Sequence, residues 1–262
     1  MDENKHRFLV RVAVILTVAW VGWTFYDSYF TSADPYANKL SSADRFFEDG
    51  RYAKALDVCD EILDRDPENI DALVAGGAEI VYVSPLKDSE LPALDALYIG
   101  GGFPETHAEQ LSTNTRFNSQ LKALAEDGFP IYAECGGLMY LGEQLVLENK
   151  SYPMVGILPV TFDFFKRPQG HGYSIIKVEG QNPYYEVGSE IRGHEFHYSR
   201  VSKRDSRKSD LVFRMQRGAG IEKDRDGILY KNVLATYTHV HALGTPEWAP
   251  ALIRNAIKFK KR

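Results

Sequence analysis

The chain has 262 residues, a formal net charge of -5 and a hydrophobic content of 44%. This length suits one large domain or two small ones, and the acidic balance gives no general electrostatic reason to expect a nucleic acid partner. The two cysteines, Cys59 and Cys135, lie in segments of very different character, so they do not suggest a disulfide framework. Free thiols favour a reducing compartment.

Residues 1–33 form the first segment and contain a mostly apolar run at 8–26, in which Arg11 is the single charge. Aromatic residues crowd the far end of the run, as they do at membrane interfaces, and about 20 apolar residues span a bilayer. We therefore expect an uncleaved membrane anchor. A signal peptide is the alternative, although Thr31-Ser32-Ala33 makes a poor cleavage site.

Residues 34–74 show a helical pattern that Asp49-Gly50 interrupts and Pro67 ends. Two amphipathic stretches around a glycine turn predict a helical hairpin that resembles one tetratricopeptide repeat. A single repeat cannot bury its own apolar face. We therefore expect a fragment of an array, a cap on another domain or a dimer element, with Cys59 at a packing position.

Residues 75–262 differ from the preceding segment in their pattern of apolar residues and form the last predicted domain. Short apolar runs read as buried strands, an amphipathic stretch at 115–127 reads as a helix, and a last helix is expected at 247–260. Strands that alternate with helices predict an α/β fold with a parallel sheet. The predicted strands of this part are 78–84, 96–99 and 130–133, followed by mostly strands over 154–242.

A strand followed by Cys135, two glycines and a predicted helix has the pattern of a nucleophile elbow with cysteine in place of serine. Such a sharp turn strains the backbone at the nucleophile, and the start of the following helix favours the thiolate. The alternative interpretation is a buried cysteine beside a glycine-rich turn.

A glycine-rich loop, Gly100–Gly102, follows another buried strand. Its N–H groups suit an oxyanion hole, which the N–H of Gly136 after the nucleophile would complete. A phosphate-binding loop is the alternative. No Lys-Ser/Thr pair follows, so the loop is not a P-loop.

The segment 235–241 reads as a strand that ends in His239 and His241. A cysteine hydrolase needs an imidazole that takes the thiol proton and returns it to the leaving amine. For either histidine alone, a structural hydrogen-bonded role is the alternative.

A metal site must also be weighed, because histidines and a glutamate recur in this part of the chain. The spacing in His194-Glu195-Phe196-His197 is not HExxH, and on a strand His194 and His197 face opposite sides. We therefore expect no metal. The residues considered as zinc ligands are His194, Glu195, His197, His239 and His241.

Several segments in a fixed order carry a resemblance to a known family. From about residue 76 onward the chain resembles the glutamine amidotransferase domain of the cobyrinic acid a,c-diamide synthase family, which implies a class I, flavodoxin-like sheet with flanking helices. The segments are AEIVYVSPLKDSELP (78–92), LYIGGGFPE (97–105), YAECGGLMYL (132–141), IRGHEFHYSR (191–200) and ATYTHVHA (235–242).

The resemblance implies roles for individual residues. Cys135 would attack the side-chain amide of glutamine, and N–H groups of Gly101, Gly102 and Gly136 would hold the oxyanion. His239 would be the base, with His241 as a secondary candidate in the place where many relatives carry an orienting glutamate.

The resemblance also implies partners. The ammonia would serve ATP-dependent amidation of a corrinoid, a tetrapyrrole, with ATP and magnesium on a synthetase domain absent from this chain.

The family domain opens with a further strand and helix, which we expect to be missing here, so that one edge or face of the sheet is exposed. We expect a cytoplasmic active domain tethered to a membrane through residues 8–26. The alternative is a membrane-tethered interaction module with an inactive amidotransferase-like domain.

Overall fold

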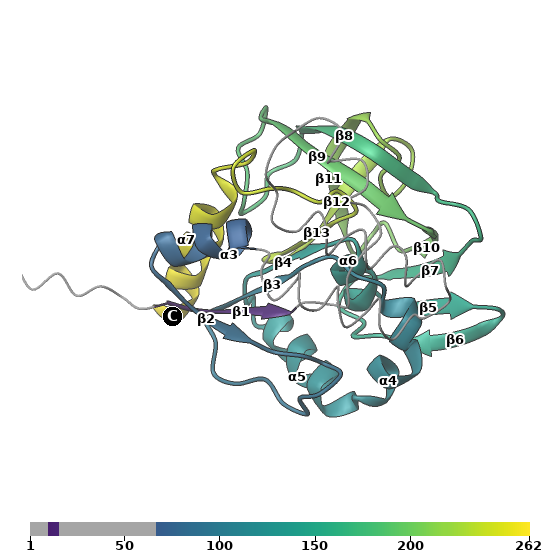
Figure 1. Ribbon diagram of the computed structural model, residues 1–262, viewed down its shortest axis with the longest axis horizontal. Coiled ribbons are helices and arrows are strands. Elements are labelled where there is room, and N and C mark those ends of the chain that lie inside the picture. The colour runs from purple at the N-terminus through teal and green to yellow at the C-terminus, as the bar shows by residue number, and fades with distance from the viewer. Residues whose placement is uncertain (1–9, 16–66) are drawn as a thin grey trace, which may run out of the picture.

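The computed structural model describes residues 10–15 and 67–262, and Figure 1 shows their arrangement. Within these residues, thirteen strands form one nine-stranded and one four-stranded sheet. The larger sheet begins with five neighbouring strands that are all parallel to one another. In spatial order these strands are β2 (Ala78–Tyr82), β1 (Val10–Ile15), β3 (Ala96–Ile99), β4 (Ile131–Glu134) and β13 (Val233–Thr236).

The other four strands extend the same sheet in antiparallel fashion from β13. They are β12 (Arg225–Tyr230), β11 (Asp210–Arg217), β8 (Gly170–Val178) and β9 (Glu190–His197). The smaller sheet has the order β10 (Ser199–Arg204), β7 (Val160–Phe164), β5 (Gln144–Leu147) and β6 (Lys150–Pro153).

Helices cover both faces of the parallel strands, with α3 and α7 on one side and α4 and α5 on the other (Figure 1). Burial on both faces explains why these strands are nearly continuous apolar runs. The helices are α3 (Pro67–Ala75), the 3-10 turn η2 (Pro104–His107), α4 (Ala108–Thr113), α5 (Thr115–Glu126), α6 (Gly136–Leu141) and α7 (Trp248–Lys260).

Two apolar clusters divide along these faces, because successive side chains of a strand point to opposite sides. In β3, Leu97 and Ile99 pack in the cluster that includes α5 and α6. Tyr98 of the same strand packs in the other cluster, with Trp248 of α7. Neighbouring residues of one strand therefore belong to different environments, which matters at the end of β4.

The expected membrane anchor is wrong for residues 10–15, which form β1 between β2 and β3. Val10, Val12 and Val14 are buried in the α3 and α7 cluster, and Ala13 in the other. A short valine-rich run suits a buried parallel strand as well as an apolar helix, and its periodicity alone does not separate the two. In the described part of the chain, no helix is long and apolar enough to cross a membrane.

The expected loss of the first strand and helix of the domain is also corrected, because β1 and α3 supply them. The sequence predicts that the helical pattern ends at Pro67, but helix α3 begins there and packs against β2 and α7. Proline suits this first position, where its missing N–H has no helical partner to lose. Residues 67–74 thus join the α/β unit, although the expected boundary lay at residue 75. The remainder of the predicted hairpin, 34–66, lies outside the described residues.

Candidate active site

Cys135 lies between β4 and α6 with φ 43° and ψ -95°, which is the strained turn that the sequence predicts. A non-glycine residue in such a backbone conformation costs on the order of 1–3 kcal/mol and persists only where its surroundings enforce it. The Cys135 N–H donates to the Thr236 carbonyl at 2.8 Å. This bond joins the nucleophile strand to the end of β13, the strand that precedes His239.

Glycines bring the loop after β3 against this turn. A Cβ added to Gly136 would lie 2.4 Å from the Gly102 carbonyl oxygen, closer than real Cβ contacts. A Cβ on Gly101 would lie 2.2 Å from Cε1 of the His239 ring. The loop, the nucleophile turn and His239, which come from three separate segments, therefore meet in one place.

The backbone around His239 is held by its neighbours. His239 exchanges two hydrogen bonds with His194 of β9, at 2.8 and 3.1 Å, and the two rings stack with centroids 4.7 Å apart. The buried Asp226 accepts the N–H groups of Tyr237 and Thr238 at 3.1 and 3.2 Å. These contacts position the imidazole on the glycine loop.

The His239 side chain is 19% exposed, and burial lowers its pKa to about 4. A pKa in this range keeps the imidazole neutral at pH 7, which is the form that can accept a proton. His241 lies in the turn beyond, where its Nδ1 accepts the Leu243 N–H at 3.3 Å. The structure thus holds His239, rather than His241, against the glycine loop.

Glu134 is a site residue that the sequence reasoning missed. Its Oε2 lies 3.6 Å from His239 Nδ1, while its oxygens also accept the Tyr98 hydroxyl and the Val240 N–H, each at 3.2 Å. Strand alternation sends Glu134 to the face opposite Cys135. The available signal was a glutamate that directly follows an apolar predicted strand, since carboxylates are rarely buried without a partner.

Burial raises the pKa of Glu134 to about 8, against the lowering effect of the bonds from Val240 and Tyr98. Asn69 of α3 extends this buried polar group. Its side-chain amide donates to Tyr98 and to the Val240 carbonyl, and its oxygen accepts the Ala242 N–H at 2.7 Å. The segment that follows His239 is therefore tied to α3.

The Cys135 thiol differs from the sequence expectation of a ready thiolate. It is buried, and its Sγ donates to the Phe196 carbonyl at 3.5 Å. Burial raises the pKa of the thiol well above its usual range, and the charges of Glu105 and Glu134 add to the effect, while the Gly136 N–H opposes it. The free protein therefore favours a neutral Cys135 thiol and a neutral His239 imidazole.

The histidines considered as zinc ligands have other contacts. His197 Nδ1 lies 2.9 Å from the Ser199 carbonyl oxygen, and its ring stacks on Tyr237 with centroids 3.7 Å apart. Glu195 accepts the N–H groups of Ala219 and Gly220. Among the described residues, there is no group of three or more His, Cys, Asp or Glu side chains that could hold a metal ion.

Curated sequences of cobyrinate a,c-diamide synthases align with most of the chain. It is 44% identical over 188 residues to the cobyrinate a,c-diamide synthase of Magnetococcus marinus, covering 72% of this chain and 40% of that protein. The chain is 40% identical over 231 residues to the cobyrinate a,c-diamide synthase of Archaeoglobus fulgidus, and the alignment covers 86% of this chain and 50% of that protein. The chain thus spans half or less of the length of these relatives.

Solved structures share the fold at low sequence identity. One glutamine amidotransferase structure has a TM-score of 0.53 at 20% identity, with 72% of this chain and 92% of that one covered. PurLQS from Thermotoga maritima has a TM-score of 0.56 at 16% identity, with 96% of this chain and 100% of that one covered.

The sequence model of the CobB/CobQ-like glutamine amidotransferase domain matches residues 63–247. The chain belongs to the CobB/CobQ-like glutamine amidotransferase family.

Proposed function

We propose that this chain hydrolyses the side-chain amide of glutamine to glutamate and ammonia through a thioester on Cys135. One observation carries the proposal: the strained turn at Cys135, the loop at Gly101 and Gly102, and the His239 imidazole converge from separate strand ends. A nucleophile, a base and a set of backbone N–H groups are the parts that acyl transfer requires.

The chemistry follows from the protonation states. His239 takes the proton of the Cys135 thiol, and the sulfur attacks the amide carbon of glutamine. N–H groups of the Gly101–Gly102 loop and of Gly136 stabilise the tetrahedral oxyanion. His239 then returns the proton to the departing nitrogen, which leaves as ammonia, and afterwards activates a water molecule that hydrolyses the thioester to glutamate and free thiol.

Glu134 is the group proposed to orient the base. When ionised it can accept the His239 Nδ1–H and so keep Nε2 unprotonated for the thiol, as the acid of a catalytic triad does. The separation of 3.6 Å between Glu134 Oε2 and His239 Nδ1 is longer than a hydrogen bond. Catalytic hydrogen bonds are often long without substrate and shorten in the complex.

The names of the relatives support a finer proposal for the destination of the ammonia. We assign it to the amidation of corrinoid carboxylates by an ATP-dependent synthetase domain or partner. The loop at Gly100–Gly102 does not fit the phosphates of ATP, because no Lys-Ser/Thr pair follows it and it packs against Gly136 and His239. We therefore propose that ATP and magnesium bind to the synthetase.

The experiment measures glutamate release from glutamine by the parent protein and by Cys135→Ala. We expect the variant to fall to the uncatalysed background while it keeps the parent circular dichroism spectrum, because the thioester cannot form. A matched variant, Ser174→Ala, removes a buried hydroxyl in β8 and should retain activity. Equal release by the parent and Cys135→Ala would refute the proposal.

A further inference from the structure

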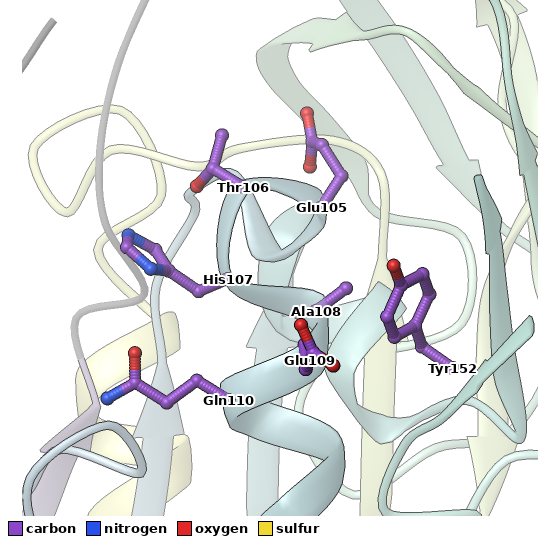
Figure 2. Close-up of a pocket in the computed structure, with 7 residues that line it drawn as sticks. All are labelled: Glu105, Thr106, His107, Ala108, Glu109, Gln110 and Tyr152. Atoms are coloured by element: carbon purple, nitrogen blue, oxygen red, sulfur yellow. The ribbon is translucent and has the colours of Figure 1, made fainter. Parts of the chain in front are cut away.

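A buried carboxylate oxygen without a partner lies on the turn that follows the glycine loop. Glu105 is the second residue of η2, and this turn packs against α6, the helix that begins after the nucleophile. The Oε2 atom of Glu105 is buried and accepts no hydrogen bond. Figure 2 shows Glu105 at the upper end of the turn, with the His107 ring directed to the other side.

Glu105 is close enough to the nucleophile for its charge to matter. After burial, the charge of Glu105 is the next largest cause of the raised pKa of the Cys135 thiol, ahead of Glu134 and Glu195. No ion pair joins Glu105 to a Lys or Arg side chain of the described residues. An uncompensated carboxylate beside a thiol opposes the thiolate that the reaction needs.

The other two carboxylates near Cys135 already have donors on both oxygens. Glu195 accepts the Ala219 and Gly220 N–H groups at 2.7 and 2.8 Å, and Glu134 accepts Val240 and Tyr98. Glu105 alone among the three keeps an oxygen that a bound group could use. A buried carboxylate that lacks a donor is costly unless a cation or donor arrives with the ligand.

We propose that Glu105 binds the α-ammonium group of the amino acid substrate through its unpartnered Oε2, and so selects an amide that carries an α-amino group. The inference rests on the proposed glutaminase function and names how the same site recognises its substrate. The incoming ammonium neutralises the charge that disfavours the thiolate. Substrate binding therefore makes Cys135 easier to deprotonate, and the thiol stays protonated and less reactive when the site is empty.

The pH dependence of binding follows from the same group. Burial raises the pKa of Glu105 to about 7, while a backbone hydrogen bond lowers it in part. Since only the ionised carboxylate pairs with an ammonium, KM for glutamine should fall as the pH rises through about 7. The flattening of this dependence in a Gln variant would assign it to Glu105.

The experiment compares Glu105→Gln with the parent on glutamine and on glutaramate, which has the same amide but no α-amino group. A hydrogen bond to a charged group contributes about 1.5–3 kcal/mol, so KM for glutamine should rise roughly 10- to 100-fold in the variant, with a smaller change in kcat. Glutaramate hydrolysis should not fall in the variant, because glutaramate has no ammonium group to pair with Glu105. Glu190→Gln, an exposed carboxylate at the start of β9 that pairs with Arg192, is the matched control and should behave as the parent.

Glu105→Asp keeps the charge and should recover part of the preference for glutamine, which a purely structural role would not predict. An unchanged ratio of glutamine to glutaramate turnover in Glu105→Gln would overturn the inference and leave the glutaminase function intact. If the parent protein shows no Cys135-dependent hydrolysis of either substrate, the proposed function itself is refuted.

If Glu105→Gln hydrolyses neither substrate, the rates at which two reagents alkylate Cys135 test whether Glu105 binds the ammonium group. Iodoacetamide carries no ammonium and should label the variant at least as fast as the parent, because the Glu105 charge that opposes the Cys135 thiolate is gone. The glutamine analogue 6-diazo-5-oxonorleucine carries one and should label the variant at least about tenfold more slowly, the lower end of the KM effect above. Equal slowing with both reagents would overturn the assignment of Glu105 to the ammonium.

Discussion

The two parts of the large sheet place their polar residues differently. In the parallel part, Cys135 and the Gly100–Gly102 loop lie directly after the carboxyl ends of strands, and His239 follows closely after β13. In the antiparallel part, His194, Glu195 and His197 lie within β9 itself. Parallel strands gather their ends at one edge, so residues distant in sequence meet there.

This difference separates reacting groups from supporting ones. The strand ends bring a nucleophile, an imidazole and glycine N–H groups together, whereas β9 contributes backbone bonds to His239 and a buried carboxylate that fixes the turn at Ala219 and Gly220. Substitutions at the strand ends should therefore affect chemistry, and those within β9 should affect stability. The following experiments test this contrast.

The largest effect after loss of the nucleophile is expected at His239. His239→Asn should lower kcat by about 10²–10⁴-fold, the usual contribution of general acid–base catalysis, whereas His241→Asn should leave kcat within a few fold. Steady-state glutamate release at saturating glutamine measures both. A larger loss at His241 would exchange the two roles and remove the distinction between the strand-end residue and its neighbour.

Glu134→Gln is expected to lower kcat by about 10²-fold or more with little change in KM, because an amide no longer selects the required imidazole tautomer. The ionised carboxylate is the active form and its pKa is raised to about 8. The parent kcat should therefore increase as the pH rises through about 8, and the variant should lose this increase. A pH profile that is identical in both proteins would exclude Glu134 as the orienting group.

Glu195→Gln tests the antiparallel part and should act on stability. An amide cannot accept both the Ala219 and the Gly220 N–H groups, so the free energy of unfolding at neutral pH should fall by about 1–3 kcal/mol. The kcat of the folded fraction should stay close to that of the parent. Urea denaturation and initial rates on the same preparation give the two quantities, and a loss of kcat without a loss of stability would contradict the contrast.

The smallest effect is the pH dependence of this stability. Burial raises the pKa of Glu195 from 4.5 to about 7, with the nearby Asp226 charge adding to it. The folded state thus binds this proton more tightly than the unfolded state, and the associated stabilisation is full below about pH 4.5 and is lost as the pH rises through about 7. Glu195→Gln should remove this part of the decline, which denaturation at pH 5 and pH 8 would measure.

Much of the α/β fold could be predicted from sequence, because its strands and helices have strong local patterns. The strand predicted at 96–99 matches β3 in both bounds, and the helix predicted at 115–127 differs from α5 by one residue. Residues 10–15 could not be assigned in this way. Their valine pattern fits either a membrane helix or a buried strand, and only pairing with β2 and β3 decides between them.

The sequence by itself determined the nucleophile turn at Cys135 and the glycine loop, because both depend on local backbone requirements that particular residues at adjacent positions reveal. The tertiary structure alone decided that Glu134 meets His239, that Asn69 holds the segment after it and that Glu105 keeps an unpartnered oxygen. Such contacts join residues far apart in the chain. Burial then shifts the pKa values of Glu134, His239 and Glu105 and limits water as a partner. The spacing of these residues in the sequence reveals neither effect.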